Sequence, residues 1–193
     1  IVMANSPRTV LQFGGIDPAY GTNPMAFGFP SMGNSIVFDM AASAITWYGL
    51  VRAKALGEKL PDNVAIDKDG NITTDPDSAM GGAILPFDHS YKGSGLAMVV
   101  ELLAGVLSGA QYDFDKGDWG TTFIALDPDL LIGGDEFKKR SSDLVKKVKA
   151  GRVKDGATIR IPGYDLEDEI QEKINSGMID IDEKILNDLK QMI

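Results

Sequence analysis

Short runs of apolar residues separated by turn-forming residues fill the first forty positions of the chain and predict strands. Residues 25–30 and 35–38 are typical of two strands joined by a turn. From Asp39 to about Leu60, apolar residues recur at helical spacing instead. This pattern predicts a helix that Asp39 caps at its N-terminus and that Pro61 ends.

The second half of the chain predicts more helices than strands. The segment 96–108 is apolar on nearly every side, which predicts a buried central helix. Its one charged residue, Glu101, is expected to be a satisfied partner in a buried pair rather than an acid catalyst. Further helices are predicted over 135–150, 166–176 and 182–193, and strands over 123–126 and 158–161. The chain is therefore expected to be an α/β protein, with a layered mixed sheet, covering helices and additional C-terminal helices.

A short apolar strand is followed three times by a turn and a predicted helix start, over 36–40, 84–96 and 159–166. Helix starts present backbone amides and the positive end of the helix dipole, which favour anionic ligands. At the first of these helix mouths stands Asp39, whose carboxylate can accept hydrogen bonds from ribose hydroxyls. Three predicted helix N-termini of this kind indicate a site suited to an anionic ligand.

The other two mouths carry different residues. Lys92 followed by Gly93 combines a point charge with backbone that lacks a side chain, which suits phosphate or a substrate carboxylate. The third mouth carries Gly163, Tyr164 and Asp165. Every one of these residues also has a plain structural explanation, because aspartates often cap helices, glycines form turns and lysines are solvated.

The composition of the 193-residue chain excludes several kinds of site. The absence of cysteine excludes disulfides and thiolate ligands, and a single histidine, His89, excludes a multi-histidine zinc site. Asp67, Asp69 and Asn71 have the first spacing of a calcium loop, but Ser78 occupies its twelfth position, so no metal site is predicted. A net charge of −9 argues against nucleic-acid binding.

No membrane-spanning segment is predicted either. The most apolar window, 96–107, contains Glu101 and is too short to cross a bilayer. The sequence begins at Ile1 without a signal-peptide pattern or an initiator methionine. We therefore expect a fragment or processed chain of a cytoplasmic protein.

Six segments of the sequence, in this order and spacing, resemble the malate/L-lactate dehydrogenase family that is not of the Rossmann type. They are GGIDPAYGTNPMAFGFP, IVFDMAAS, ITTDPDSAMGGAILP, YKGSGLAMVVELLAGVLSGA, FIALDP and IRIPGYD. The resemblance covers essentially the whole chain. It implies an NAD(P)-dependent oxidoreductase, usually a homodimer, with a cofactor fold of its own. The implied reaction interconverts a 2-hydroxy acid and a 2-oxo acid by hydride transfer, or reduces a cyclic imine acid.

The resemblance also implies which residues contact the cofactor, either NAD or NADP. These are Asp39, Met40 and Ala41, then Lys92 and Gly93, then Gly163, Tyr164 and Asp165. The residues are those of the three helix mouths. No arginine marks a site for the 2′-phosphate, so the choice between the two cofactors stays open.

Two differences from the family affect the catalytic residues. Family members are longer, and their catalytic histidine, with a nearby arginine, lies in an N-terminal region that this sequence does not contain. The catalytic group is therefore expected outside this chain, which alone would be inactive, or on a separate N-terminal polypeptide. Many members also carry histidine directly before the loop lysine, where this chain has Tyr91. His89, two residues earlier, inherits no role.

We expect residues 1–128 to form a cofactor-binding α/β domain that is incomplete at its N-terminus. Residues 129–193 are expected to form a C-terminal helical segment with one strand and the Pro-Gly cofactor loop. The alternative function is that of a non-catalytic fragment that binds a nucleotide or a partner protein.

Overall fold

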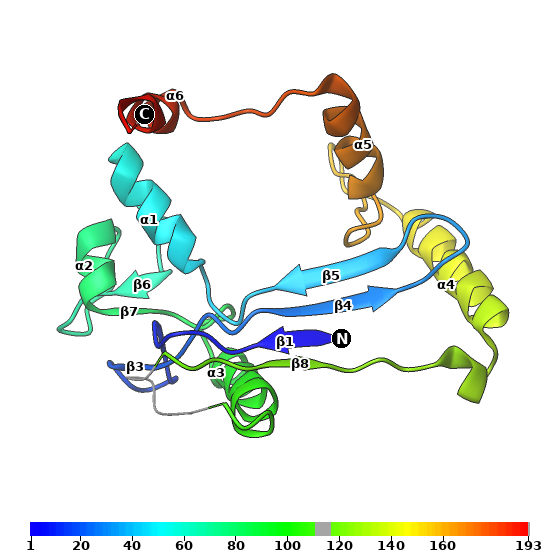
Figure 1. The fold of residues 1–193 in the computed structure, drawn as a ribbon, viewed down its shortest axis with the longest axis horizontal. Coiled ribbons are helices and arrows are strands. Elements are labelled where there is room, and N and C mark those ends of the chain that lie inside the picture. The colour runs from blue at the N-terminus through cyan, green and yellow to red at the C-terminus, as the bar shows by residue number, and fades with distance from the viewer. Residues whose placement is uncertain (111–116, 193) are drawn as a thin grey trace. The chain divides into compact units, whose positions relative to one another are not determined.

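The fold is described from a computed structural model, which places residues 1–110 and 117–192 (Figure 1). Its contacts divide the chain into two compact units. The hairpin unit contains residue 1 with 26–39 and 124–180, and the core unit contains 2–25, 40–123 and 181–193. Helices and strands are interleaved along the sequence, as predicted for an α/β protein. The predicted boundary between residues 128 and 129 stays a prediction, because units defined by contacts are not shown to fold independently.

A small mixed sheet organises the core unit. Its strand order is β3-β2-β7-β6, with β2 parallel to β7 and the other two pairs antiparallel. The strands are β2 (Val10–Leu11), β3 (Pro18–Tyr20), β6 (Ala65–Ile66) and β7 (Ala83–Ile84). Val10 and Ile84, which face each other across the parallel pair, are fully buried. Their burial explains why these short runs are apolar without alternation.

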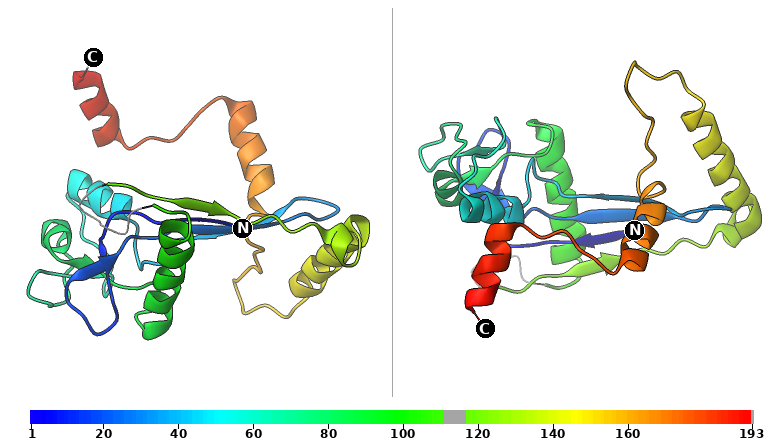
Figure 2. Two further views of the ribbon diagram at one scale, coloured as in Figure 1. Left: turned by 60° about the horizontal axis from the view of Figure 1, so that its bottom comes forward. Right: turned by 90° about the horizontal axis from the view of Figure 1, so that it is seen from above.

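A second strand pair in the core unit lies along a long helix. Strand β1 (Val2–Ala4) pairs antiparallel with β8 (Thr121–Phe123), and both contact the segment η1 (Glu101–Val106). The Thr122 hydroxyl donates to the Leu103 carbonyl over 2.6 Å. Helix α3 (Tyr91–Val100) continues without a break into η1, which is π-helical (Figure 2).

This long helix differs from its prediction in two respects. It begins at Tyr91 rather than residue 96, because the Ser90 hydroxyl accepts a hydrogen bond from the Lys92 amide and caps the earlier start. It is also not buried on nearly every side. Met98, Leu102 and Leu107 are exposed, and only the face with Ala97, Val100 and Ala104 is buried.

The predicted helix over 39–60 is the largest error of the sequence prediction. Residues Ile36–Met40 form strand β5, and helix α1 runs only from Trp47 to Leu56, with Thr46 as its N-cap. Residues 41–44 lie outside any helix, in a segment of bends with one β-bridge at Ser43, and the Ala44 amide donates to the Leu85 carbonyl over 2.8 Å. Their burial comes from pairing with a distant loop, which local spacing cannot reveal.

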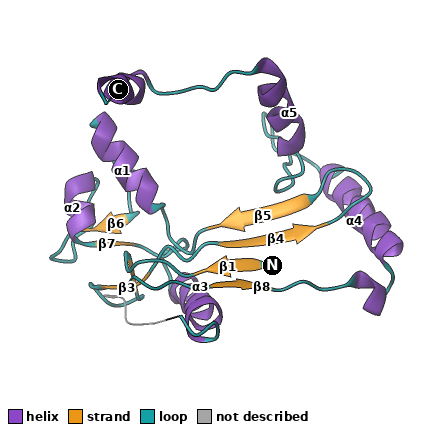
Figure 3. Ribbon diagram, in the orientation of Figure 1, coloured by secondary structure: helices purple, strands orange, loops and turns teal. Residues whose placement is uncertain are grey.

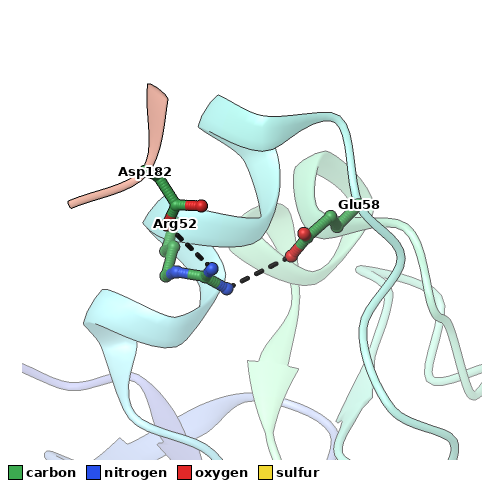
Figure 4. Close-up of polar contacts among 3 residues, drawn as sticks. All are labelled: Arg52, Glu58 and Asp182. Atoms are coloured by element: carbon green, nitrogen blue, oxygen red, sulfur yellow. Dashed lines mark hydrogen bonds and ion pairs between the residues drawn. The ribbon is translucent and has the colours of Figure 1, made fainter. Parts of the chain in front are cut away.

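Two further features of the core unit concern short and C-terminal helices. Helix α2 (Pro76–Gly81), capped by Asp75, was not predicted. Helix α6 (Glu183–Gln191) confirms the last predicted helix. Arg52 of α1 binds both Glu58 and Asp182, over 3.2 and 2.9 Å, and thereby ties α1 to the start of α6 (Figure 4).

The hairpin unit contains most of the longer strands β4 (Met25–Phe29) and β5, which are neighbours in one sheet (Figure 3). Both confirm the predicted strand pair. Helices α4 (Gly134–Lys149) and α5 (Leu166–Ser176) confirm two predicted helices, and Pro128–Leu130 form a 3₁₀ turn. The strand predicted over 158–161 is absent. Thr158 and Arg160 are exposed, Ile159 and Ile161 are half-buried, and the stretch has no ladder partner among the described residues.

Candidate functional site

The predicted residues Met40 and Ala41 are the last residue of β5 and the residue after it, and hydrogen bonds hold the following residue, Ala42, in the core unit. The Ala42 amide donates to the Thr22 carbonyl over 2.8 Å, and the Ala42 carbonyl accepts from the Phe87 amide over 3.0 Å. Ala42 is fully buried, whereas Met40 and Ala41 are half-buried. Hydrogen bonds therefore fix the backbone at Ala42, while Met40 and Ala41 stay partly accessible to a ligand.

Asp39, predicted as a helix cap at the first mouth, instead lies in strand β5 and is exposed. Helix α1 begins eight residues further on, with its first-turn amide of Gly49 bound by the Thr46 hydroxyl. The prediction of a helix mouth at 36–40 is therefore wrong. The reason is that the backbone of residues 42–44 is hydrogen-bonded to distant segments, as described above.

The loop that leads into α3 brings the predicted Lys92 and Gly93 next to an unpredicted carboxylate, Asp88. One oxygen of Asp88 accepts from the amides of Ser90 and Gly93, over 3.0 and 2.9 Å. The other accepts from the Ser90 hydroxyl over 2.5 Å. These hydrogen bonds, the one from the Ser90 hydroxyl first, lower the pKa of the Asp88 carboxyl below its ordinary value.

Two backbone amides in the first turn of α3 are therefore already hydrogen-bonded to side chains of the preceding loop. Asp88 takes the Gly93 amide and the Ser90 hydroxyl takes the Lys92 amide, so neither of these amides is available to a phosphate. What this loop offers an anionic ligand is the exposed Lys92 side chain. A helix does start within the predicted stretch 84–96, although earlier than predicted, and the charge of the Lys92 side chain rather than the backbone amides suits an anionic ligand.

Gly93 is required by close packing in the same loop. A Cβ added there would lie 2.4 Å from Asp88 Oδ1 and 2.9 Å from Pro86 Cβ. Pro86 forms a β-bridge with Ser43. The structure thus brings the Met40–Ala41 segment and the Lys92 loop together within the core unit, through residues 42–44 on one side and 85–87 on the other.

The third predicted loop lies in the hairpin unit, against strand β5. The Val37 amide donates to the Pro162 carbonyl over 3.0 Å, and Gly163, at φ 69°, packs directly on the Val37 backbone. The Asn34 side chain donates to the Tyr164 carbonyl over 2.9 Å. The loop is thereby fixed to the hairpin that β4 and β5 form, at its turn and at β5.

Asp165 is occupied in holding this loop. One of its carboxylate oxygens accepts from the Ile161 amide over 2.9 Å, and the other binds the Lys149 ammonium. The Lys149 ammonium also lies 5.1 Å from the centre of the Tyr164 ring. The hydrogen bond from Lys149, and next the one from Ile161, lower the pKa of the Asp165 carboxyl. Asp165 precedes α5, but its side chain does not cap that helix.

The described part of the chain offers a pocket outside the predicted cofactor segments. No cluster of His, Asp or Glu that could hold a metal is found there, and no described helix is long and apolar enough to cross a membrane. A pocket of about 510 Å³ lies between the end of α1 and residues 72–77. None of the eight predicted cofactor residues lines it.

The sequence matches the pattern of the family described as malate/L-lactate dehydrogenase over residues 1–190. It is 36% identical to the L-sulfolactate dehydrogenase of Methanothermobacter thermautotrophicus, over 96% of this chain and 55% of that protein. It is 40% identical to a Δ1-pyrroline-2-carboxylate/Δ1-piperideine-2-carboxylate reductase of Pseudomonas syringae pv. tomato, over 76% of this chain and 46% of that protein.

This chain belongs to the malate/L-lactate dehydrogenase family. The fold agrees with solved structures of such enzymes. The sulfolactate dehydrogenase of Methanocaldococcus jannaschii matches with a TM-score of 0.80 and 32% identity, over 98% of this chain and 57% of that one. The resemblance seen in the sequence is thus confirmed, and the chain spans about half the length of these relatives.

Two functional candidates were not found from the sequence. Asp88 organises the Lys92 loop, and its signal was present, since Asp followed two residues later by Ser before a helix start is typical of a side-chain turn. Ser43 was not singled out either. It lies within the IVFDMAAS segment, and only the structure shows that its hydroxyl is buried and unpaired among the described residues.

Proposed function

We propose that this chain carries cofactor contacts of an NAD(P)-dependent oxidoreductase that interconverts a 2-hydroxy acid and a 2-oxo acid. The observation that carries the proposal is the joining of two predicted cofactor segments in one unit. Ala42 links Met40 and Ala41 to the loop of Lys92 and Gly93 through its hydrogen bond with Phe87. Family membership supports a dehydrogenase or reductase of small hydroxy or oxo acids.

The residues present fit a polar cofactor at this place. The Ser43 side chain is only 7% exposed, and its hydroxyl has no hydrogen-bond partner among the described residues. A buried hydroxyl without a partner is costly, which indicates a group that a ligand satisfies. Ser43 lies two residues beyond Ala41 and is bridged to Pro86 of the Lys92 loop.

Each residue then has a distinct role. The Lys92 ammonium would pair with an anionic group of the cofactor, and the Ser43 hydroxyl would hydrogen-bond to one of its polar groups. Asp88 keeps the Lys92 loop in place through the Gly93 amide. A bound nicotinamide supplies or accepts the hydride. The proton of the substrate hydroxyl is assigned to a group outside these 193 residues, as the family resemblance implies.

The remaining predicted features are part of the same proposal. Asp39 and the 163–165 loop are proposed as further cofactor contacts, with Asp165 acting through the loop that it holds. We also propose a homodimer in the cytoplasm, with the catalytic histidine on another part of the protein or on a separate N-terminal polypeptide. A non-catalytic nucleotide-binding fragment is the alternative, and reduction of a 2-oxo acid by the 193-residue chain alone would eliminate it.

Lys92→Ala tests the main site assignment. We expect the intact protein to bind NADH or NADPH about tenfold more weakly, because a charge-assisted contact is lost. The thermal unfolding midpoint should be unchanged, since Lys92 is exposed. Calorimetric titration gives the dissociation constant. Lys59→Ala, on the pocket at the end of α1, is the matched control and should bind cofactor like the unmodified protein.

Ser43→Ala is expected to change stability and cofactor affinity in a combination that would not be seen if Ser43 had a purely structural role. Without cofactor the variant should be as stable as the unmodified protein or more so, because a buried unpaired hydroxyl is removed. Cofactor affinity should nevertheless fall by about threefold to tenfold, as one neutral hydrogen bond is lost.

Thr9→Val is its control. The Thr9 hydroxyl is also buried without a partner among the described residues, but it lies on neither cofactor segment. This variant should gain stability with no change in affinity. Equal cofactor affinity in Ser43→Ala and Thr9→Val would contradict the role given to Ser43.

A further inference from the structure

The core unit buries a carboxylate that the proposed reaction does not use. Glu101, the first residue of η1, is 7% exposed. Its Oε1 accepts from the Asn5 side-chain amide over 2.8 Å, and its Oε2 accepts from the Asn23 side-chain amide over 3.0 Å. The predicted burial is confirmed, but both partners are neutral amides rather than a cation.

Both asparagines are fixed in orientation by the backbone around them. The side-chain oxygen of Asn5, Oδ1, accepts from the Gly120 backbone amide over 2.8 Å. The side-chain oxygen of Asn23, Oδ1, accepts from the Ser6 backbone amide over 3.2 Å. Its side-chain nitrogen also donates to the Ala97 backbone carbonyl over 3.0 Å. Neither amide can turn over without losing these bonds. Two N–H donors therefore face residue 101, and only a side chain with two acceptor oxygens satisfies both.

Asn23 connects this carboxylate to the cofactor segments. It is completely buried and has a left-handed backbone with φ 43°, which an asparagine tolerates only at some cost. The carbonyl of the preceding residue, Thr22, accepts from the Ala42 amide over 2.8 Å. The Ala42 carbonyl in turn accepts from Phe87, at the start of the Lys92 loop. The left-handed turn thus sets where the Thr22 carbonyl points.

We infer that Glu101 is a positioning residue for the cofactor site. By holding Asn23, it keeps the Thr22 carbonyl against Ala42 and so fixes both the Met40–Ala41 segment and the Lys92 loop. Glu101 touches neither the cofactor nor the substrate in this role. The inference rests on the proposed function, and it explains why an acidic residue interrupts an otherwise apolar helix.

Glu101→Gln is the first test, because glutamine keeps the shape of the side chain but replaces one acceptor by an N–H₂ donor. That donor must face either Asn5 or Asn23, whose own donors cannot turn away. We expect the dissociation constant of NADH or NADPH to rise about tenfold in the intact protein, measured well below the unfolding temperature.

The double variant Asn5→Asp/Glu101→Gln is the matched rescue. An aspartate at position 5 accepts both from the Gly120 amide and from the new glutamine N–H₂, which leaves the glutamine oxygen for Asn23. Cofactor affinity should return to within about threefold of the unmodified protein. Failure of the double variant to recover affinity, when the single variant has lost it, would overturn the inference.

A control separates positioning from a general loss of stability. Leu50→Ala removes a fully buried side chain of α1 in the same unit. It should lower the unfolding midpoint at least as much as Glu101→Gln while leaving the dissociation constant unchanged. If Glu101→Gln lowers the midpoint but binds cofactor normally, the residue is only structural and the inference is wrong.

A second variant covers the case in which Glu101→Gln does not fold. Asn23→Gly keeps the left-handed backbone but removes the side chain that Glu101 holds, and it should also weaken cofactor binding about tenfold. Unchanged affinity in Asn23→Gly would overturn the inference. An unmodified protein that binds neither cofactor would instead refute the proposed function, so the two failures are distinguishable.

Discussion

Gly93→Ala should destabilise the protein by about 1–2 kcal/mol, and Gly95→Ala, two residues further along α3, should stabilise it by about 0.5–1 kcal/mol. Both changes gain helix propensity. At Gly93 a Cβ would meet Asp88 Oδ1 at 2.4 Å and Pro86 Cβ at 2.9 Å, whereas at Gly95 no atom lies within 4 Å. The clash therefore outweighs the gain only at Gly93.

Cofactor affinity extends this comparison to function. The Asp88 oxygen that the new methyl group displaces is the one that accepts from the Gly93 amide, so the Lys92 loop must shift. Gly93→Ala should therefore weaken NADH or NADPH binding by about tenfold or more, and Gly95→Ala should leave it unchanged. Thermal unfolding and calorimetric titration of the two variants give both quantities. Equal stabilities would show that the loop is not packed as described.

Gly163→Ala should release the 163–165 loop from strand β5. Its backbone has φ 69°, and an added Cβ would lie 2.7–2.9 Å from three atoms of Val37, two of them backbone. Left-handed strain costs about 1 kcal/mol, and the crowding adds about 1–3 kcal/mol. Because this penalty is local, we expect the Val37 amide, which donates to Pro162, to exchange its hydrogen much faster than in the unmodified protein.

Gly156→Ala separates the cost of left-handed backbone strain from the cost of crowding. Gly156 also has a left-handed backbone, φ 75°, but no atom lies within 4 Å of an added Cβ. This variant should lose only about 1 kcal/mol and leave exchange at Val37 unchanged. The same exchange rate at Val37 in both variants would contradict the close contact assigned to Gly163.

The elements that the sequence predicts correctly are those whose signals are local. Helices α4 and α5 follow from amphipathic spacing, and Gly177, the glycine directly after α5, ends it with a left-handed residue at φ 63°. Strands β4 and β5 follow from apolar runs around a turn. In each case the deciding residues lie within one turn or one strand of the element.

The errors have non-local causes. Residues 41–44 have the apolar spacing of a helix, but their backbone hydrogen bonds go to Thr22, Leu85 and Phe87, which are distant in sequence. Burial of these side chains therefore says nothing about their local conformation. The start of α3 was misplaced for a different reason. The prediction places that start at residue 96, although Asp88 and Ser90 are residues of the type that cap helices.

The candidate site stays a prediction in its eight residues. The eight residues follow from the family resemblance, and the structure shows how four of them, Met40, Ala41, Lys92 and Gly93, are joined through Ala42 and Phe87. The hydrogen bonds of Asp88 and Ser90 to the amides at the start of α3 are missing from the prediction, although an Asp followed two residues later by Ser is typical of such a turn. The buried hydroxyl of Ser43 and the fixed amides facing Glu101 also depend on chain segments far apart in sequence.

Direct titration of the intact protein with NADH and with NADPH tests the central claim most directly. The account predicts saturable binding of at least one of the two, and a rise of the unfolding temperature with its concentration, because the ligand binds only the folded state. Absence of binding for both, in a protein shown to be folded, would contradict the assignment of a nicotinamide cofactor site to this chain.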